Sequence, residues 1–355
     1  MPQPALDRTA TDSGPGLRTP VVLIAFRRPD VTRRNLEVLR QVRPERLFVV
    51  ADGPRPGNTE DEQQCAAVRD VLDAVDWPTT IEHKYAESNL GLEANVELGL
   101  DWVFSQVDRA IVLEDDCIPD PTFFAFCDEL LERYADDPRI WQIGGDTHLV
   151  PQEMFAGASY AFSTWASVWG WATWADRWHA HRAVFDRDHA GAEERFDRLP
   201  RTADAHRTEP AVPHPDALVT EAARRHFSFV STEPDGDRYG WDHHWWVTIM
   251  SRQGLSVMPS VNLVTHDGYG EGATHTRAAK DPYPAVAMEF PLVHPPAVEL
   301  NRAVEGELEL VLLRTDGRLS RLARKLIKPL WIRALVRRVL EIPFVWRLVR
   351  RVVSQ

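Results

Sequence analysis

Residues 110–116 read AIVLEDD, four apolar residues followed by Glu114, Asp115 and Asp116. A short, uninterrupted apolar run predicts a strand that is buried on both faces. Three carboxylates at the end of such a strand are electrostatically costly unless a cation or hydrogen-bond donors offset their charge. Divalent cations such as Mg²⁺ and Mn²⁺ take carboxylate oxygens as ligands. An acidic triplet is more often a solvated turn, but its place after a buried strand favours a cation site here.

Similar apolar runs lie on the N-terminal side of this stretch and alternate with segments of helical spacing. The strands are expected at 20–26 (PVVLIAF), 47–51 (LFVVA) and 80–85, and the helices at 31–42, 60–75 and 92–106. This alternation predicts an α/β fold with a Rossmann-like, mostly parallel central sheet flanked by helices. Ligands of such sheets bind beyond the carboxyl ends of the strands. Asp52, Asn89 and the acidic triplet all follow predicted strands, so we expect them at one edge of the sheet.

Composition and charge restrict the class of protein. The chain has 355 residues, 44% of them hydrophobic, and a formal net charge of −12, which argues against nucleic acid as the main partner. Its three cysteines are odd in number and match no zinc or disulfide spacing, which favours reduced cytosolic thiols. Residues 1–18 lack the apolar core of a secretory signal, and no apolar stretch approaches the roughly 20 residues of a membrane-spanning helix. The sequence therefore predicts a cytoplasmic protein.

The C-terminal segment differs from the rest of the chain. Residues 318–355 contain eleven Lys and Arg against a single acid, Glu341, so this segment carries +10 and the remainder −22. Its basic residues alternate with Leu, Ile, Val and Trp at helical spacing, which is typical of a helix lying in an anionic membrane interface. The alternative is a solvated helix whose apolar face docks on the acidic body. The membrane interpretation places the protein at the inner face of the membrane as a peripheral protein.

Residues 110–126 (AIVLEDDCIPDPTFFAF) resemble the metal-binding stretch of GT-A glycosyltransferases. The likeness is to the EDD variant typical of N-acetylglucosaminyltransferase I and of bacterial family 2-like sugar transferases, and it covers roughly residues 19 to 280. The resemblance implies a GT-A fold that binds Mn²⁺ or Mg²⁺. It also implies that Asp116 ligates the metal, while Asp115 and Glu114 contact hydroxyls of the donor.

The resemblance extends to the donor pocket. Arg28 stands where the family has an arginine that meets the nucleotide, and a guanidinium suits phosphate through its planar fork. Asp52 resembles the acid that accepts the uracil imide N–H, although an Asp before Gly-Pro also forms turns. Asn89 and Asn95 match the segment that closes over the base and ribose. Asn89 could instead occupy a left-handed turn.

The same resemblance suggests the catalytic base. Residues 239–246 (YGWDHHWW) are similar to the family's WD motif, in which the aspartate deprotonates the acceptor hydroxyl, so Asp242 is the candidate base. The alternative is that Asp242 is the N-cap of a helix over 243–252. His275 lies in a segment similar to a loop after the base and could ligate the metal, with a structural role equally open. His266 stands where relatives have asparagine.

Tryptophans concentrate between residues 165 and 178 (WASVWGWATWADRW), a stretch that resembles the acceptor-side segment of the family. Indole faces pack on sugar rings, and indole N–H groups donate to hydroxyls. Trp169, Trp171 and Trp241 are candidate acceptor contacts, although core packing must account for most of the cluster.

Together these features predict four parts in the chain: a disordered tail (1–18), a nucleotide-sugar-binding half (19–140), an acceptor-binding and catalytic half (141–300) and a basic amphipathic segment (301–355). The predicted function is an inverting, metal-dependent hexosyltransferase of polysaccharide biosynthesis. Its donor is expected to be a UDP-sugar of the UDP-GlcNAc kind, and its acceptor a saccharide or lipid-linked saccharide. One alternative is a sugar-phosphate nucleotidyltransferase, but residues 26–30 (FRRPD) replace the Gly-rich loop such enzymes need. A second is a non-catalytic carbohydrate-binding relative.

Overall fold

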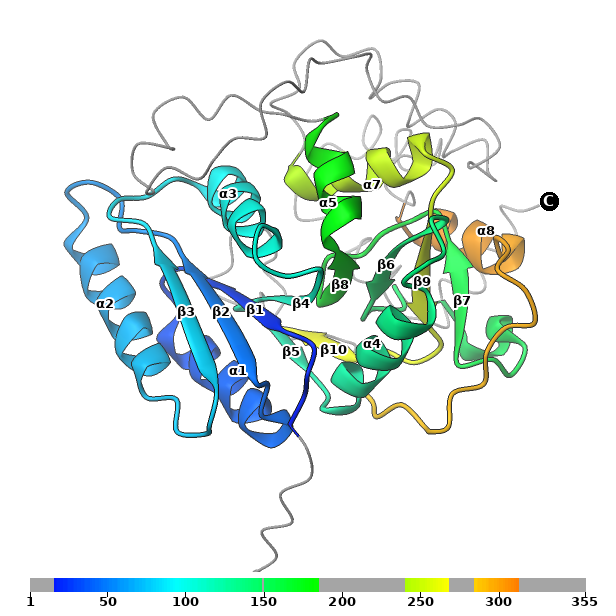
Figure 1. The fold of residues 1–355 in the computed structure, drawn as a ribbon, viewed down its shortest axis with the longest axis horizontal. Coiled ribbons are helices and arrows are strands. Elements are labelled where there is room, and N and C mark those ends of the chain that lie inside the picture. The colour runs from blue at the N-terminus through cyan, green and yellow to red at the C-terminus, as the bar shows by residue number, and fades with distance from the viewer. Residues whose placement is uncertain (1–15, 149, 185–239, 268–283, 313–355) are drawn as a thin grey trace, which may run out of the picture.

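The computed structural model describes residues 16–148, 150–184, 240–267 and 284–312 (Figure 1). Eight strands form a central sheet, in the spatial order β3 (Thr80–Tyr85), β2 (Arg46–Ala51), β1 (Val21–Ala25), β4 (Arg109–Glu114), β8 (Trp171–Trp174), β6 (Ile140–Gly144), β9 (Leu255–Pro259) and β7 (Tyr160–Ser163). Strands β8 and β7 run antiparallel to their neighbours, and the other six share one direction. A separate antiparallel pair joins β5 (Cys117–Pro119) to β10 (Val264–His266).

Helices cover both faces of the sheet. They are α1 (Pro29–Val42), α2 (Thr59–Asp73), α3 (Leu92–Phe104), α4 (Thr122–Arg133), α5 (Ala175–Arg182), α7 (Trp241–Ser251) and α8 (Arg302–Leu312), with a short 3-10 helix η1 (Gln152–Phe155). The predicted α/β class, with a mostly parallel, Rossmann-like sheet between helices, is confirmed. Both halves expected from the sequence contribute strands to this one sheet. The predicted basic tail at 318–355 lies outside the described residues.

Alternation along β1 shows how the sheet is buried on both faces. Val21 and Leu23 belong to the apolar cluster that α1, α2 and α4 form on one face. Val22 and Ile24 belong to the cluster that α3, α5 and α7 form on the other. Side chains of a strand point alternately to opposite faces, so a continuous apolar run is what a sheet covered on both faces requires.

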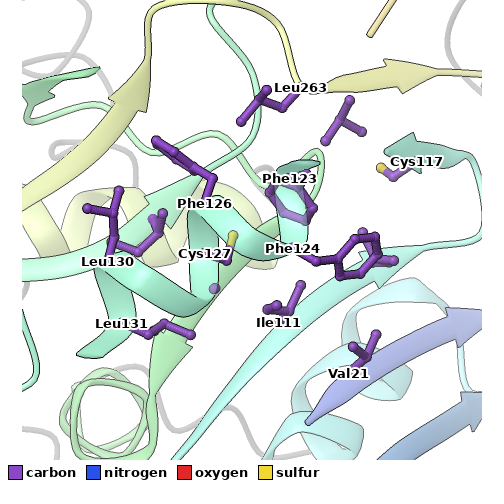
Figure 2. Close-up of a cluster of buried hydrophobic side chains, with 14 of the residues drawn as sticks. Val21, Ile111, Cys117, Phe123, Phe124, Phe126, Cys127, Leu130, Leu131 and Leu263 are labelled. Atoms are coloured by element: carbon purple, nitrogen blue, oxygen red, sulfur yellow. The ribbon is translucent and has the colours of Figure 1, made fainter. Parts of the chain in front are cut away.

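Helix α4 packs on the sheet beside β4, the strand that leads into the acidic triplet (Figure 2). Its buried face presents three phenylalanines and two leucines: Phe123, Phe124, Phe126, Leu130 and Leu131. These side chains lie against Ile111 of β4 and Val21 of β1. Fully burying a side chain of this size contributes about 1.5–3 kcal/mol. The strand that carries the acidic triplet is therefore held in place by a large apolar contact.

Two alternative interpretations of single residues are wrong. Helix α7 begins at Trp241 with Gly240 as its N-cap, so Asp242 is the second residue of the helix and not its cap. The left-handed conformation near Asn89 falls on Gly91, with φ of 83°, and Asn89 itself is not among the residues of positive φ.

Residues 284–300 cross the molecule without regular secondary structure and lead into α8. Helix α8 packs on β7, where Glu305 accepts a hydrogen bond from Ser163 Oγ (2.5 Å). No helix among the described residues is long and apolar enough to cross a lipid bilayer.

Candidate active site

The carboxyl ends of β2, β1 and β4 lie side by side, because β1 pairs in parallel with both of its neighbours. Arg28 follows β1, Asp52 follows β2, and Glu114 to Asp116 end β4. The residues that the sequence placed beyond predicted strands therefore meet at one sheet edge, as a parallel arrangement requires.

Arg28 bridges two members of the acidic triplet. Its Nη2 donates a hydrogen bond to Asp115 Oδ1 and lies 3.1 Å from Asp116 Oδ2. The backbone N–H of Phe26 also donates to Asp115, over 3.3 Å. Burial by itself would lower the pKa of Arg28, but the charges of Asp115 and Asp116 outweigh it and raise that pKa above its ordinary value. The turn after β1 and the end of β4 thus form one charged unit.

The triplet carries more negative charge than Arg28 offsets. Burial, reinforced by Asp116, Asp115 and Asp242, raises the pKa of Glu114 to about 8. Burial also raises the pKa of Asp115, against the opposing charge of Arg28. Carboxyl groups that resist ionisation in this way would be stabilised as anions by an added cation. This supports the cation site expected from the sequence.

Two hydrogen bonds fix the backbone of the triplet. The Asn35 side chain in α1 donates through Nδ2 to the carbonyl of Asp115 (2.8 Å). The N–H of Asp267 donates to the carbonyl of Asp116 (2.7 Å), and Asp267 is ion-paired with Arg34, the neighbour of Asn35 in α1. Asn35 was not predicted from the sequence, although it is a polar residue on the buried face of α1, beside Leu36 and Leu39.

His266, to which the sequence assigned no role, lies beside Asp116. The β5–β10 pairing sets His266 opposite Cys117, and its Nε2 is 3.5 Å from Asp116 Oδ2. Trp169 stacks on the His266 ring with centroids 4.5 Å apart, and His148 lies on Trp169 with centroids 5.6 Å apart. The rings of His266, Trp169 and His148 therefore form a row of aromatic contacts that begins beside Asp116.

Asp52 holds the loop that begins α3. Its carboxylate accepts hydrogen bonds from four donors: Gly53 N–H (2.8 Å), Leu90 N–H (2.8 Å), Gly91 N–H (3.2 Å) and Asn89 Nδ2 (2.7 Å). Three of these four donors are backbone N–H groups. A Cβ on Gly53 would lie 2.6 Å from the backbone of Ser88, so the two loops approach closely only because that residue is glycine. These contacts give Asp52 the turn-forming role left open by the sequence.

Asp242 reaches the same site from the other layer. It lies in the first turn of α7 with an exposed side chain, and its charge contributes to the raised pKa of Glu114. A Cβ on Gly240 would lie 2.4 Å from Asp242 Oδ1 and 3.1 Å from Glu93 Oε1. The carboxylates of Asp242 and Glu93 therefore gather where the N-termini of α7 and α3 meet. Glu93 had no place in the sequence analysis.

Three other candidates are buried. Trp171 and Trp241 are 0% and 2% exposed and pack in the core beneath α7, so in this conformation neither offers a face to a saccharide. Asn95 is 3% exposed, and its Oδ1 has no hydrogen-bond partner among the described residues. His275 lies outside those residues.

The donor atoms suit one kind of metal site. Within the described ranges, no group of three His, Cys, Asp or Glu side chains could enclose a metal ion by itself. Mg²⁺ is usually held through one or two carboxylates together with water and substrate phosphates, and Mn²⁺ favours the same oxygen ligands. Asp116 and Asp115, with the acidic Glu114 beside them, supply this smaller set. The residues fit an ion shared with a diphosphate rather than an ion held in a protein cage.

Comparisons with known proteins add little to this geometry. No protein-family model matches the chain, and no curated protein matches it. Among solved structures, a UDP-glucose pyrophosphorylase complexed with UDP-glucose is 9% identical, with a TM-score of 0.25; the match covers 42% of this chain and 63% of that one, less than two thirds of its length. Mouse xyloside xylosyltransferase 1 in its apo form is 10% identical over 45% of this chain and 68% of that one, with a TM-score of 0.28. Superpositions of this quality define neither the fold nor the activity of the chain.

Proposed function

We propose that this protein is a metal-dependent glycosyltransferase that moves a sugar from a nucleoside diphosphate sugar to a hydroxyl group of a saccharide or lipid-linked saccharide. The observation that carries the proposal is the crowding of three carboxyl groups, those of Glu114, Asp115 and Asp116, beside the single guanidinium of Arg28. A site that needs added positive charge next to a partly exposed guanidinium suits a diphosphate that arrives with a divalent cation.

Asp116 and Asp115 would hold the cation. When bound, Mn²⁺ or Mg²⁺ supplies positive charge that stabilises the departing diphosphate. Arg28 adds a planar fork of N–H donors for the same phosphates. The loop at 89–91, which Asp52 holds through hydrogen bonds, would contact the nucleoside. The sequence resemblance favours UDP as the nucleotide. The raised pKa of Glu114 suits a carboxyl group that shares hydrogen bonds with sugar hydroxyls.

Asp242 is the proposed base. An inverting transfer needs a carboxylate that takes the proton of the acceptor hydroxyl as that oxygen attacks the anomeric carbon. Asp242 is exposed, belongs to the electrostatic environment of Glu114 and stands on a different layer from Arg28. Trp169, partly exposed beside His266, is the proposed aromatic contact for the acceptor.

The test is a thermal-unfolding screen of UDP-, TDP- and GDP-sugars, with and without Mn²⁺, followed by a transfer assay with the best donor. We expect one donor class to raise the unfolding temperature only when Mn²⁺ is present. Asp242→Asn should keep that stabilisation and lose about 10²- to 10⁴-fold in transfer rate. Absence of any donor effect with the intact protein would refute the proposal.

Other outcomes of the same screen identify the alternatives. Pyrophosphate release from a nucleoside triphosphate and a sugar phosphate would identify a nucleotidyltransferase. Donor binding without transfer or hydrolysis, unchanged by Asp242→Asn, would identify a non-catalytic relative. The proposed membrane contact is separate from both, and deletion of 318–355 should abolish pelleting with anionic liposomes if that segment is the anchor.

A further inference from the structure

The Arg28 side chain is only partly used by its contacts with the triplet. Both ion pairs are made by one terminal nitrogen, Nη2, to Asp115 and Asp116. Arginine carries five N–H donors, and Nε and Nη1 of Arg28 have no partner among the residues that the structure describes. The side chain is 33% exposed, whereas the two carboxylates it contacts are 5% and 14% exposed. The guanidinium is therefore more accessible to a ligand than either carboxylate that it contacts.

Arg28 also occupies the carboxylates that a metal ion would need. A guanidinium brings one positive charge to Asp115 and Asp116, whereas a divalent cation brings two. Electrostatics alone would thus let a divalent cation replace Arg28, but the displaced guanidinium then needs another anion. A diphosphate is such an anion, because its oxygens match the fork of arginine N–H donors.

We propose that Arg28 orders the assembly of this site: it holds Asp115 and Asp116 while the site is empty and turns to the diphosphate when the donor arrives. The carboxylates then accept a divalent cation together with the diphosphate, and only weakly without it. This inference rests on the proposed function and adds an order of binding to it. In this scheme Arg28 controls the cation site through the two carboxylates before the donor binds, and it contacts the diphosphate afterwards.

The backbone around Arg28 allows this movement without unfolding the turn. Arg28 precedes the first residue of α1, and its carbonyl accepts hydrogen bonds from the N–H (3.0 Å) and Oγ1 (2.9 Å) of Thr32. Those contacts involve only the backbone of Arg28, so its side chain can change partner while the helix start stays fixed. Asn35 and Phe26 continue to hold Asp115.

The experiment measures Mn²⁺ affinity by electron paramagnetic resonance of the free ion, with and without UDP, using the full chain. In the wild type we expect UDP to tighten Mn²⁺ binding markedly. In Arg28→Gln, Mn²⁺ alone should bind about tenfold more tightly than in the wild type, because its competitor for the carboxylates is gone. The gain in Mn²⁺ affinity on adding UDP should shrink correspondingly.

Arg27→Gln is the matched control. Its side chain is also 33% exposed, but it pairs with Asp61 (3.3 Å) instead of the triplet. We expect Mn²⁺ binding to Arg27→Gln to match the wild type under both conditions. Arg28→Lys keeps a positive charge beside the carboxylates, so it should restore weak binding of Mn²⁺ alone and provides a second reading if Arg28→Gln folds poorly.

Two results would overturn the inference, and they bear differently on the proposed function. If Arg28→Gln binds Mn²⁺ alone no more tightly than the wild type, or more weakly, Arg28 merely supports the turn, and the glycosyltransferase proposal stands. If neither Mn²⁺ nor UDP binds the wild type under any condition, the proposed function fails and the ordering fails with it.

Discussion

The carboxylates at the ends of β2 and β4 lie at the same sheet edge but are satisfied in opposite ways. Asp52 receives four hydrogen bonds, three of them from backbone N–H groups of its own and the following loop. The triplet at 114–116 shares one guanidinium, and the pKa values of Glu114 and Asp115 are raised. The first carboxylate holds a loop through hydrogen bonds, whereas the second group places three carboxyl groups beside a single guanidinium.

On this comparison Asp52 maintains the structure, whereas the triplet at 114–116 is the proposed ligand-binding group. A carboxylate that already accepts hydrogen bonds from the protein gains little stability from a ligand. Its mutation lowers the free energy of unfolding, because its donors lose their acceptor. A crowded acidic cluster behaves in the opposite way, because each removed charge relieves repulsion in the empty protein. Stability and activity should therefore respond in opposite directions at the two places.

The largest expected effect is on activity, in Asp116→Asn. Under the proposed function this change removes a metal ligand, so the transfer rate should fall by about 10²- to 10³-fold or more. The free energy of unfolding of the ligand-free protein should stay unchanged or rise, since one of three crowded charges is lost. Steady-state kinetics and urea denaturation measure the two quantities on the same preparation. Loss of both activity and stability would mean that Asp116 maintains the structure as Asp52 does, which would contradict the difference drawn between them.

The next effect is on stability, in Asp52→Ala. The change leaves the buried N–H of Gly53, the partly buried N–H groups of Leu90 and Gly91 and the amide of Asn89 without their acceptor, so the free energy of unfolding should fall by about 2 to 4 kcal/mol. Urea denaturation gives this value, and hydrogen exchange of the Leu90 and Gly91 amides should accelerate in the same variant. Full stability with lost donor binding would instead assign Asp52 to the nucleotide and contradict the folding role.

The sequence predicted the sheet edge well because its signals are local. The runs VVLIA, LFVVA and AIVL are apolar at every position, and two-sided burial is the usual cause of such runs. The sites of Asp52, Asn89 and the triplet followed from the rule that parallel strands end at one edge, whereas Arg28 followed from the family resemblance. The predicted bounds differ from the observed ones by one or two residues, as at α1, which begins at Pro29 instead of 31.

Partners that are distant in the chain could not be predicted in this way. The contact of His266 with Asp116 depends on the pairing of β10 with β5, two three-residue strands far apart in sequence. The meeting of Glu93 with Asp242 depends on two helix N-termini converging across a layer. The burial of Trp171 could not be predicted either, because a tryptophan that faces a sugar and one that packs in the core look alike in the sequence.

A third carboxylate, Glu305, is intermediate between Asp52 and the triplet in how far hydrogen-bond donors satisfy it. It gives the smallest of the expected effects. It is fully buried in α8 and accepts hydrogen bonds from Ser163 Oγ (2.5 Å) and from the Oγ1 and N–H of Thr164. Burial raises its pKa from 4.5 to about 7, with the charge of Glu309 adding to the increase and the donors opposing it. Four donors hold Asp52, whereas these three, two of them hydroxyls, do not overcome the desolvation of Glu305.

The pH dependence follows from that direction. The folded protein holds the Glu305 proton more tightly than the unfolded chain, so this stabilisation is fully present below pH 4.5 and is lost as the pH rises to about 7. At one unit of pKa per 1.36 kcal/mol, the loss should amount to about 2 to 3 kcal/mol. Glu305→Gln cannot ionise, so the difference in unfolding free energy between wild type and variant, measured by urea denaturation at pH 5 and pH 8, isolates this group. A difference that does not change with pH would mean that the hydroxyl donors satisfy Glu305 as fully as the backbone satisfies Asp52. Hydroxyl and backbone N–H donors would then be equally effective for Asp52 and Glu305. Only the crowding of the three carboxyl groups at 114–116 would distinguish the triplet from these two residues.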